Sequence, residues 1–309
     1  MELKPKLRRF LSDFLDESKL SLLERCLTLE PRVCVRTNTL KISSKRLVLL
    51  LTERGWQLTR VPWFKDAFFV EGATNVGKTP EHLLGYYYTQ DGSSLVPPVV
   101  LDAKPGERIL DLCAAPGSKT TQIAAMMHNE GAIVANDVSS KRCKALQFNL
   151  QRCGVINAIV TMMDGRKFHE LGITFDRVLV DAPCTGTGKL IGIQGKGVNR
   201  QWQFYAGIKL ARLQRKLLES AVKCTKKGGV VVYSTCSLDP RENEAVITKV
   251  AEKFELELEK IDVPGLKYER GLKAFDGREF VDGIEGSIRI YPWHNQTEGF
   301  FVCRMVVKE

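Results

Sequence analysis

Residues 107–119 read ERILDLCAAPGSK. The apolar residues Ile109 and Leu110 predict a buried strand that reaches Asp111, and a short turn containing Gly117 leads into the helical spacing of residues 118–128. A strand that turns directly into a helix is the repeating unit of α/β proteins. This stretch therefore predicts the first strand and the first helix of such a fold.

The same alternation continues toward the C-terminus. Near-continuous apolar runs, typical of strands covered on both faces, occur at 107–113, 132–138, 157–163, 176–182 and 229–236. Helical spacing occurs between them at 118–128, 139–153 and 207–225. This order predicts an α/β protein with a Rossmann-like, doubly wound, mostly parallel sheet. Two more apolar runs, at 254–260 and 299–307, predict a total of seven strands.

The first 90 residues do not follow this pattern. The expected elements there are helices at 8–29 and 43–55 and strands at 34–40, 56–62 and 66–72. They predict a small N-terminal α+β domain over residues 1–90, followed by a second domain over residues 91–309. Residues 80–98, which end in a proline pair, predict an irregular connector.

The chain has 309 residues and a net charge of +10. Residues 1–90 hold 15 Lys and Arg and 10 Asp and Glu, so half of the excess lies in less than a third of the chain. A basic surface favours a polyanionic partner such as a nucleic acid. Neither a signal peptide nor an apolar run of about 20 residues is recognisable. We therefore expect a cytoplasmic protein without a membrane segment, or a nuclear or nucleolar one in a eukaryote. Separately, we expect a monomer.

Nine cysteines are present, and none are spaced as C-x-x-C or clustered with the four histidines. This pattern favours reduced thiols over a zinc site or a disulfide framework, so no metal is expected.

Ligands of open α/β sheets bind beyond the carboxyl ends of the strands. The side chains expected there are Asp111, Asp137, Asp164, Asp181 with the nearby Cys184, and Thr235 with Cys236. Asp137 is placed to bind the hydroxyl pair of a ribose. The first turn has one glycine, where a pyrophosphate site would need several. A cofactor with adenosine and no phosphate fits better, which indicates S-adenosylmethionine.

A competing motif is GATNVGKT (72–79), which matches the phosphate-binding loop of nucleotide triphosphatases. In such loops the Lys-Thr pair opens a helix. Here Pro80 follows directly and biases Thr79 away from helical angles. A nucleotide triphosphatase is therefore the remote alternative.

Five motifs together resemble the Sun-type RNA cytosine-5 methyltransferases. They are DLCAAPGSKT (111–120), AND (135–137), DAPCTGTG (181–188), STCSLDPRENE (234–244) and EGFF (298–301). The resemblance implies an RNA-contacting N-terminal domain before a class I methyltransferase domain. It assigns S-adenosylmethionine to Cys113, Ala114, Ala115, Pro116, Gly117, Ser118, Lys119, Asp137, Arg142, Asp164 and Asp181. Asp111 is expected to support this pocket.

The same resemblance implies the reaction. A thiolate adds to C6 of cytosine, C5 then attacks the methyl group, and loss of the C5 proton releases the thiol. From the residues alone, Cys184 and Cys236 are equally placed for attack. The resemblance assigns attack to Cys236, product release to Cys184, and contact with N3 and the exocyclic amine to Asp181.

The substrate is expected to be an RNA with an unstacked cytosine. The compact architecture is most similar to archaeal-type members that act on tRNA, and rRNA is the alternative. A silent RNA-binding module on this fold is a third class. Four aromatic side chains are candidates for base stacking, with core packing as the alternative: Trp56, Trp63, Phe64 and Trp202.

Overall fold

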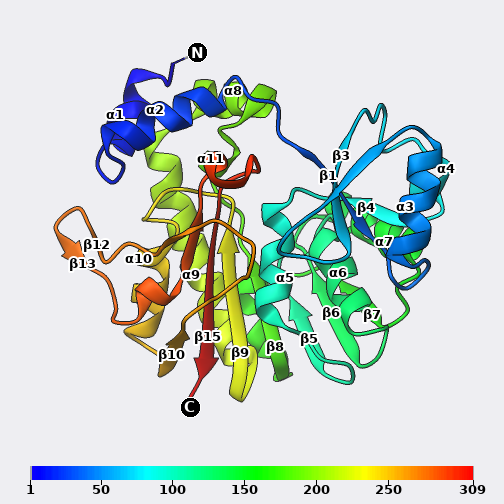
Figure 1. The fold of residues 1–309 in the computed structure, drawn as a ribbon. Coiled ribbons are helices and arrows are strands. Elements are labelled where there is room, and N and C mark those ends of the chain that lie inside the picture. The colour runs from blue at the N-terminus through cyan, green and yellow to red at the C-terminus, as the bar shows by residue number, and fades with distance from the viewer. Residues whose placement is uncertain (1, 309) are drawn as a thin grey trace.

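The computed structural model describes residues 2–308 as a large mixed sheet flanked by helices and a smaller sheet beside it (Figure 1). Five parallel strands form half of the large sheet. In spatial order they are β7 (Ala158–Thr161), β6 (Ala132–Asn136), β5 (Arg108–Asp111), β8 (Phe175–Asp181) and β9 (Thr225–Thr235). All five lie where the apolar runs predicted strands. The strand order reverses between β5 and β8, so the ligand crevice is expected beyond their carboxyl ends.

The other half of the sheet is antiparallel. β15 (Phe300–Val307) pairs with β9 on one side and with β14 (Ile288–Ile290) on the other. β11 (Glu269–Arg270) forms the edge, and β10 (Leu256–Glu259) pairs with the end of β15. The sheet thus has nine strands where the sequence predicted seven. β11 and β14 were missed because two or three residues are too few to produce a recognisable period.

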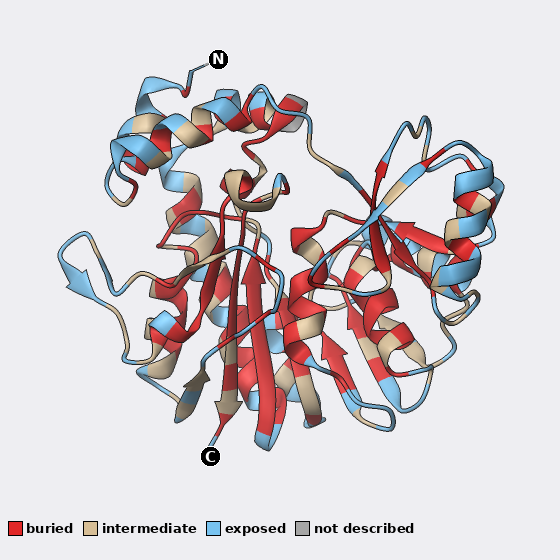
Figure 2. Ribbon diagram, viewed as in Figure 1, coloured by how far each residue is buried: buried red, intermediate tan, exposed pale blue. Residues whose placement is uncertain are grey.

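Helices cover both faces of the large sheet, and Figure 2 shows its strands as mostly buried. Leu179 and Val232 face α5 (Val96–Leu101) and α6 (Ser118–Met126). Val180 and Tyr233 face α9 (Phe204–Cys224) and α10 (Glu244–Ala251). Alternate residues of each strand therefore enter two different cores, which explains why the strands read as continuous apolar runs. α7 (Ser140–Cys153) packs beside α6.

The smaller sheet is antiparallel and has the order β2-β3-β1-β4. Its strands are β1 (Val33–Thr37), β2 (Gln57–Arg60), β3 (Ala67–Glu71) and β4 (Tyr87–Thr89). Its covering helix α3 (Ser44–Glu53) starts where predicted, with the Ser43 hydroxyl accepting the Arg46 N–H. The segment predicted as an irregular connector is ordered: it contains α4 (Pro80–Leu83), β4 and the start of α5.

The first two helices lie apart from this small sheet. α1 (Pro5–Leu11) and α2 (Glu17–Cys26) replace the single helix predicted over 8–29, because Asp16 accepts the Lys19 N–H and starts a new helix. Both pack against Leu190, Leu238 and Tyr291 of the larger part of the molecule. In Figure 1 they lie at the upper left, next to α8 (Gly192–Gln201), while β1–β4 lie at the right.

Among residues 2–308, no helix combines the length and the apolar character that crossing a bilayer requires.

Candidate active site

A cavity of about 680 Å³ opens at the carboxyl ends of the parallel strands, a volume typical of small-ligand sites. Seven side chains predicted for the site line it. They are Cys113, Asp137, Arg142, Asp164, Asp181, Cys184 and Cys236. The strand order brings them together from positions up to 123 residues apart in the sequence. Within the described chain, no group of three His, Cys, Asp or Glu side chains is arranged to hold a metal ion.

Asp137 lies almost buried at the end of β6. One carboxylate oxygen accepts the Ser139 N–H at 3.0 Å, and the other pairs with Arg142 at 3.2 Å. Arg142 also donates to the backbone carbonyl of Ala115. Arg142 thereby links the acid after β6 to the turn after β5, so both are held in one arrangement.

Residues 114–119 run from the turn after β5 into the first residues of α6. Within the part of the chain that is described, their side chains are not among those lining the cavity. Ala114, Ala115 and Gly117 are buried, Pro116 is exposed and Ser118 is half-buried. Gly117 has φ +105°, which a residue with a Cβ rarely adopts, so this glycine is required for the turn.

Lys119 is directed at Asp181 from the first turn of α6. Its Nζ donates to the Asp181 carboxylate at 2.7 Å and to the Ser94 hydroxyl at 3.0 Å. The other Asp181 oxygen accepts the Ser234 hydroxyl at 2.9 Å. Two donors therefore fix the plane of the Asp181 carboxylate at the wall of the cavity.

The two predicted cysteines lie next to each other in the lining of the cavity. Cys184 follows β8 and Cys236 follows β9, and their sulfur atoms lie 3.1 Å apart. Hydrogen bonding to Cys236, burial and the charge of the nearby Glu242 raise the pKa of the Cys184 thiol well above its usual value. Cys184 therefore keeps its proton at neutral pH and can donate it to the Cys236 sulfur.

Glu242 fastens the two cysteine-bearing loops to each other. Its fully buried carboxylate accepts hydrogen bonds from Thr185, which follows Cys184, and from Ser237, which follows Cys236. Gln214 of α9 donates to it as well, at 2.9 Å. Burial, together with the charge of Asp239, raises the pKa of Glu242 although these hydrogen bonds oppose the rise.

Gly188 joins the same loops through the backbone. Its N–H donates to the Cys236 carbonyl at 2.9 Å, and its carbonyl accepts the Gly299 N–H at 2.7 Å. A Cβ at this position would lie 2.1 Å from the Gly299 carbonyl oxygen, so only glycine fits.

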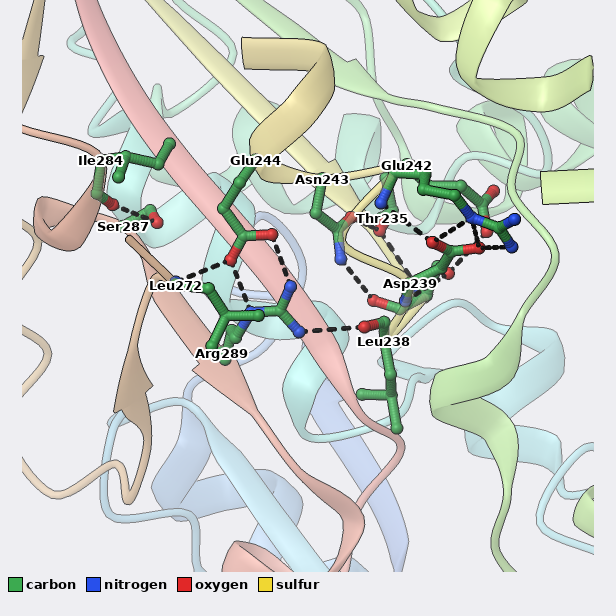
Figure 3. Close-up of polar contacts among 12 residues, drawn as sticks. Thr235, Leu238, Asp239, Glu242, Asn243, Glu244, Leu272, Ile284, Ser287 and Arg289 are labelled. Carbon is green, nitrogen blue, oxygen red and sulfur yellow. Dashed lines mark hydrogen bonds and ion pairs between the residues drawn. The ribbon is translucent and has the colours of Figure 1, made fainter. Parts of the chain in front are cut away.

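The segment after Cys236 is also held by Asn243 and Arg289, as Figure 3 shows. Asn243 accepts the Thr235 hydroxyl at 2.6 Å and donates to the Ser237 carbonyl at 2.8 Å. Glu244 forms a buried ion pair with Arg289 of β14, and Arg289 donates to the Leu238 carbonyl at 2.9 Å. These contacts leave the Cys236 loop little freedom to move.

Asp111 lies beneath the site and does not line the cavity. One oxygen accepts the Thr120 hydroxyl at 2.7 Å, and the other has no hydrogen-bond partner among the described residues. Complete burial raises the pKa of Asp111 to about 7, with the charges of Asp181 and Asp137 adding to the effect.

Sequence reasoning missed several residues at the cavity. Asn136, Arg166 and Lys189 line it. Asn136 belongs to the AND motif, Lys189 directly follows DAPCTGTG, and Arg166 lies two residues after Asp164, so proximity to a predicted residue or motif was the available signal. Arg166 forms a bidentate ion pair with Asp164, and this hydrogen bonding lowers the pKa of Asp164.

The expected stacking aromatics are mostly core residues. Trp56 and Trp63 are 6% and 7% exposed and belong to two hydrophobic cores, and Phe64 packs against one of them. Trp202 is half-buried and stacks on Phe10. Trp56 and Trp63 therefore serve core packing rather than base stacking.

The P-loop-like segment also has a structural role. Thr79 has extended backbone angles, and its hydroxyl accepts the His82 N–H. The helix that follows it has four residues. The Lys-Thr pair therefore does not open a helix that could bind phosphate, as Pro80 predicted.

The side chains that line the cavity suit S-adenosylmethionine. Three carboxylates, Asp137, Asp164 and Asp181, line it and suit a ligand with a sulfonium and an ammonium charge. Leu112, Val138 and other apolar side chains complete the wall. An open α/β sheet with a pocket of this lining at its switch point is the architecture of the class I methyltransferases.

Comparison with known proteins identifies the family. Residues 98–306 match the model of the 16S rRNA methyltransferase RsmB/F family, and residues 6–92 match the N-terminal domain of 16S rRNA methyltransferase RsmF. The chain belongs to this family, the Sun-type RNA cytosine-5 methyltransferases, whose methyl donor is S-adenosylmethionine.

Two curated relatives act on different RNAs. A tRNA (cytosine(49)-C(5))-methyltransferase of Pyrococcus abyssi is 43% identical over 89% of this chain and 88% of its own length. Ribosomal RNA small subunit methyltransferase F of Citrobacter koseri is 40% identical over 89% of this chain, but over only 57% of its own length.

Solved structures agree with the fold. A methyltransferase homologue from Pyrococcus horikoshii superposes with a TM-score of 0.82 at 36% identity, covering 99% of this chain and all of its own. The structure of NSun6 from the same organism, described as being with SFG, has a TM-score of 0.86 at 24% identity, covers 99% of this chain and 98% of its own, and supports the fold alone.

Proposed function

We propose that this chain methylates C5 of a cytosine in tRNA through a covalent adduct with Cys236. The observation that carries the proposal is the pair of cysteine sulfurs, 3.1 Å apart in a cavity that Asp181 also lines. S-adenosylmethionine supplies the methyl group. The Cys236 thiolate adds to C6, and C5 becomes nucleophilic and takes the methyl. Loss of the C5 proton to a base then lets the electron pair of the C6–S bond leave with sulfur.

The environment of Cys184 supports this division of roles. Its pKa is raised well above the usual value, so Cys184 retains a proton that it can donate to the Cys236 sulfur. We propose that Cys184 then assists release of the product.

Asp181 is proposed to hold the N3 edge and the exocyclic amine of the base. Lys119 and Ser234 fix its carboxylate, which a hydrogen bond to a planar base requires. The remaining carboxylates, Asp137 and Asp164, are proposed to bind S-adenosylmethionine together with the 113–119 turn and Arg142.

The choice of tRNA rests on length. The chain spans 88% of the archaeal tRNA enzyme and 57% of the rRNA enzyme, and the latter therefore has a large additional part. We propose further that the enzyme works as a cytoplasmic monomer.

Transfer of tritiated methyl groups to bulk tRNA and to small-subunit rRNA tests the proposal. We expect label in tRNA, and bisulfite sequencing would locate the cytosine. Label in rRNA alone would reassign the substrate. Binding of both RNAs without transfer to either would identify a silent RNA-binding module.

A further inference from the structure

A second hollow, of about 490 Å³, lies between α1 and the start of α9. Its walls carry cations and aromatic rings: Lys6, Arg9, Phe10, Trp202, Phe204 and Tyr205. We call these six residues the aromatic groove. We propose that it binds the single-stranded RNA next to the target cytosine. This inference rests on the RNA substrate proposed above.

Two rings of the groove are exposed to an unusual degree. Tyr205 is 79% exposed and Phe204 is 45% exposed, although both are large aromatic side chains. Their rings lie 5.6 Å apart, edge to face, so one flat face of Tyr205 remains open. An exposed aromatic face next to cations is the feature on which nucleic-acid bases stack.

Two helices, α8 and α9, lead from the catalytic cavity to the groove. Val198 of α8 lines the cavity, and Trp202 lies one helical turn further along, with its N–H bonded to the Val198 carbonyl at 2.9 Å. Leu213 of α9, which also lines the cavity, follows Tyr205 on the same helix. A strand leaving the cavity along α8 and α9 therefore meets the aromatic groove.

Arg241 joins the groove to the Cys236 loop. Its guanidinium lies 4.4 Å from the ring centre of Phe10 and 4.2 Å from that of Phe204. It also forms a bidentate ion pair with Asp239, three residues after Cys236. The rings are therefore held in a fixed position relative to the attacking sulfur.

The charge around the groove fits an RNA backbone. The helices α1 and α8 and residues 204–216 of α9 contain three, two and four Lys or Arg, and no Asp or Glu. Asp13 is the acidic side chain on the groove wall. A surface with this excess attracts phosphates, and its aromatic rings favour unpaired bases over a duplex.

Binding of an unstructured, fluorescently labelled RNA of about 12 nucleotides tests the inference in the absence of S-adenosylmethionine. Tyr205→Ala should weaken binding about fivefold or more, because a stacked base is lost, and Tyr205→Phe should restore it. Phe148→Ala is the matched control, since Phe148 is 60% exposed on α7, away from the groove. Thermal unfolding should be unchanged in all three variants.

The salt dependence of RNA binding distinguishes the contribution of the cations from that of the Tyr205 ring. Lys6→Gln and Arg9→Gln should each flatten the slope of log affinity against log salt by about 0.7, the value for one phosphate contact on a single strand. Tyr205→Ala should leave the slope unchanged while it lowers affinity.

Unchanged affinity in Tyr205→Ala would overturn the inference. So would loss of a dimer in sedimentation without loss of RNA affinity, because the groove would then be a self-association surface. These outcomes are independent of the proposed reaction: an enzyme that fails to methylate any RNA, yet binds RNA through Tyr205, would contradict the reaction alone.

Discussion

The loops after β8 and β9 look alike in sequence and differ in their surroundings. Both place a cysteine just beyond the end of a parallel strand, and both are fastened to Glu242. The Cys184 loop is also held by Gln214, which donates to the Pro183 carbonyl, and by Thr187, whose hydroxyl accepts the Leu238 N–H. The Cys236 loop is held additionally by Asn243 and by the Leu238 carbonyl, to which Arg289 donates. Both cysteines therefore lie on firmly held loops, and the loops differ in their anchors: Asn243 and Arg289 hold the Cys236 loop.

The largest expected effect comes from the cysteines themselves. Cys236→Ala should lower methyl transfer by about 10⁴-fold or more, because the proposed nucleophile is lost. Cys184→Ala should instead accumulate a covalent RNA–protein adduct, visible as a shifted band in a denaturing gel. A stable adduct formed by Cys236→Ala, with Cys184 intact, would reverse the assignment of roles.

Gly188→Ala should have the next largest effect. The new methyl group overlaps the Gly299 carbonyl, so the two loops must separate, with an expected loss of about 3 kcal/mol in the free energy of unfolding. Urea denaturation measures this loss. Gly197→Ala on α8 is the control, because a Cβ there meets no atom within 4 Å, and alanine inside a helix should leave the stability equal or up to about 1 kcal/mol higher. Equal stability of the two variants would show that the close approach at Gly188 is relaxed in solution.

Glu242→Ala should destabilise the protein by about 2–4 kcal/mol, because the Thr185 N–H and the Gln214 amide lose their buried acceptor. Glu242→Gln keeps the shape and should cost less, while still lowering methyl transfer about tenfold. The exposed Glu252→Ala is the control and should be neutral. Full activity of Glu242→Ala would mean that the loops do not depend on this carboxylate.

The smallest expected effect concerns the protonation of the Cys184 thiol. The pKa of Cys184 is raised above its usual value in the native protein, so little of it is thiolate at pH 8. Removing Cys236 removes the largest cause of the rise. The pKa of Cys184 should therefore fall, and iodoacetamide should alkylate Cys184 several-fold faster in Cys236→Ala than in the wild type.

Mass spectrometry of peptides measures the rates, with the buried Cys303 as an internal control. A slower reaction of Cys184 in the variant would contradict the proposed proton position.

Much of the site could be predicted from one rule: the ligands of open α/β sheets bind at the carboxyl ends of the parallel strands. That rule predicts from the sequence alone that Asp137, Asp181, Cys184 and Cys236 lie together. Glu242 could not be found in this way, because a glutamate in a polar stretch normally points to solvent, and only the pairing of two distant loops buries it.

The fold was predictable where strands are long and covered on both faces. It was not predictable where local signals are weak. β11 and β14 have two and three residues, and the break between α1 and α2 depends on one cap, Asp16. The packing partners of α1 and α2 were inaccessible for another reason, since these contacts connect positions more than 150 residues apart.

That last feature has a consequence for biosynthesis. The apolar faces of α1 and α2 emerge from the ribosome well before their partners Leu190, Leu238 and Tyr291 are translated. Contacts of such long sequence separation form slowly, and apolar surface left uncovered in the meantime favours aggregation. These two helices are therefore the part of this chain that we expect chaperones to bind during synthesis.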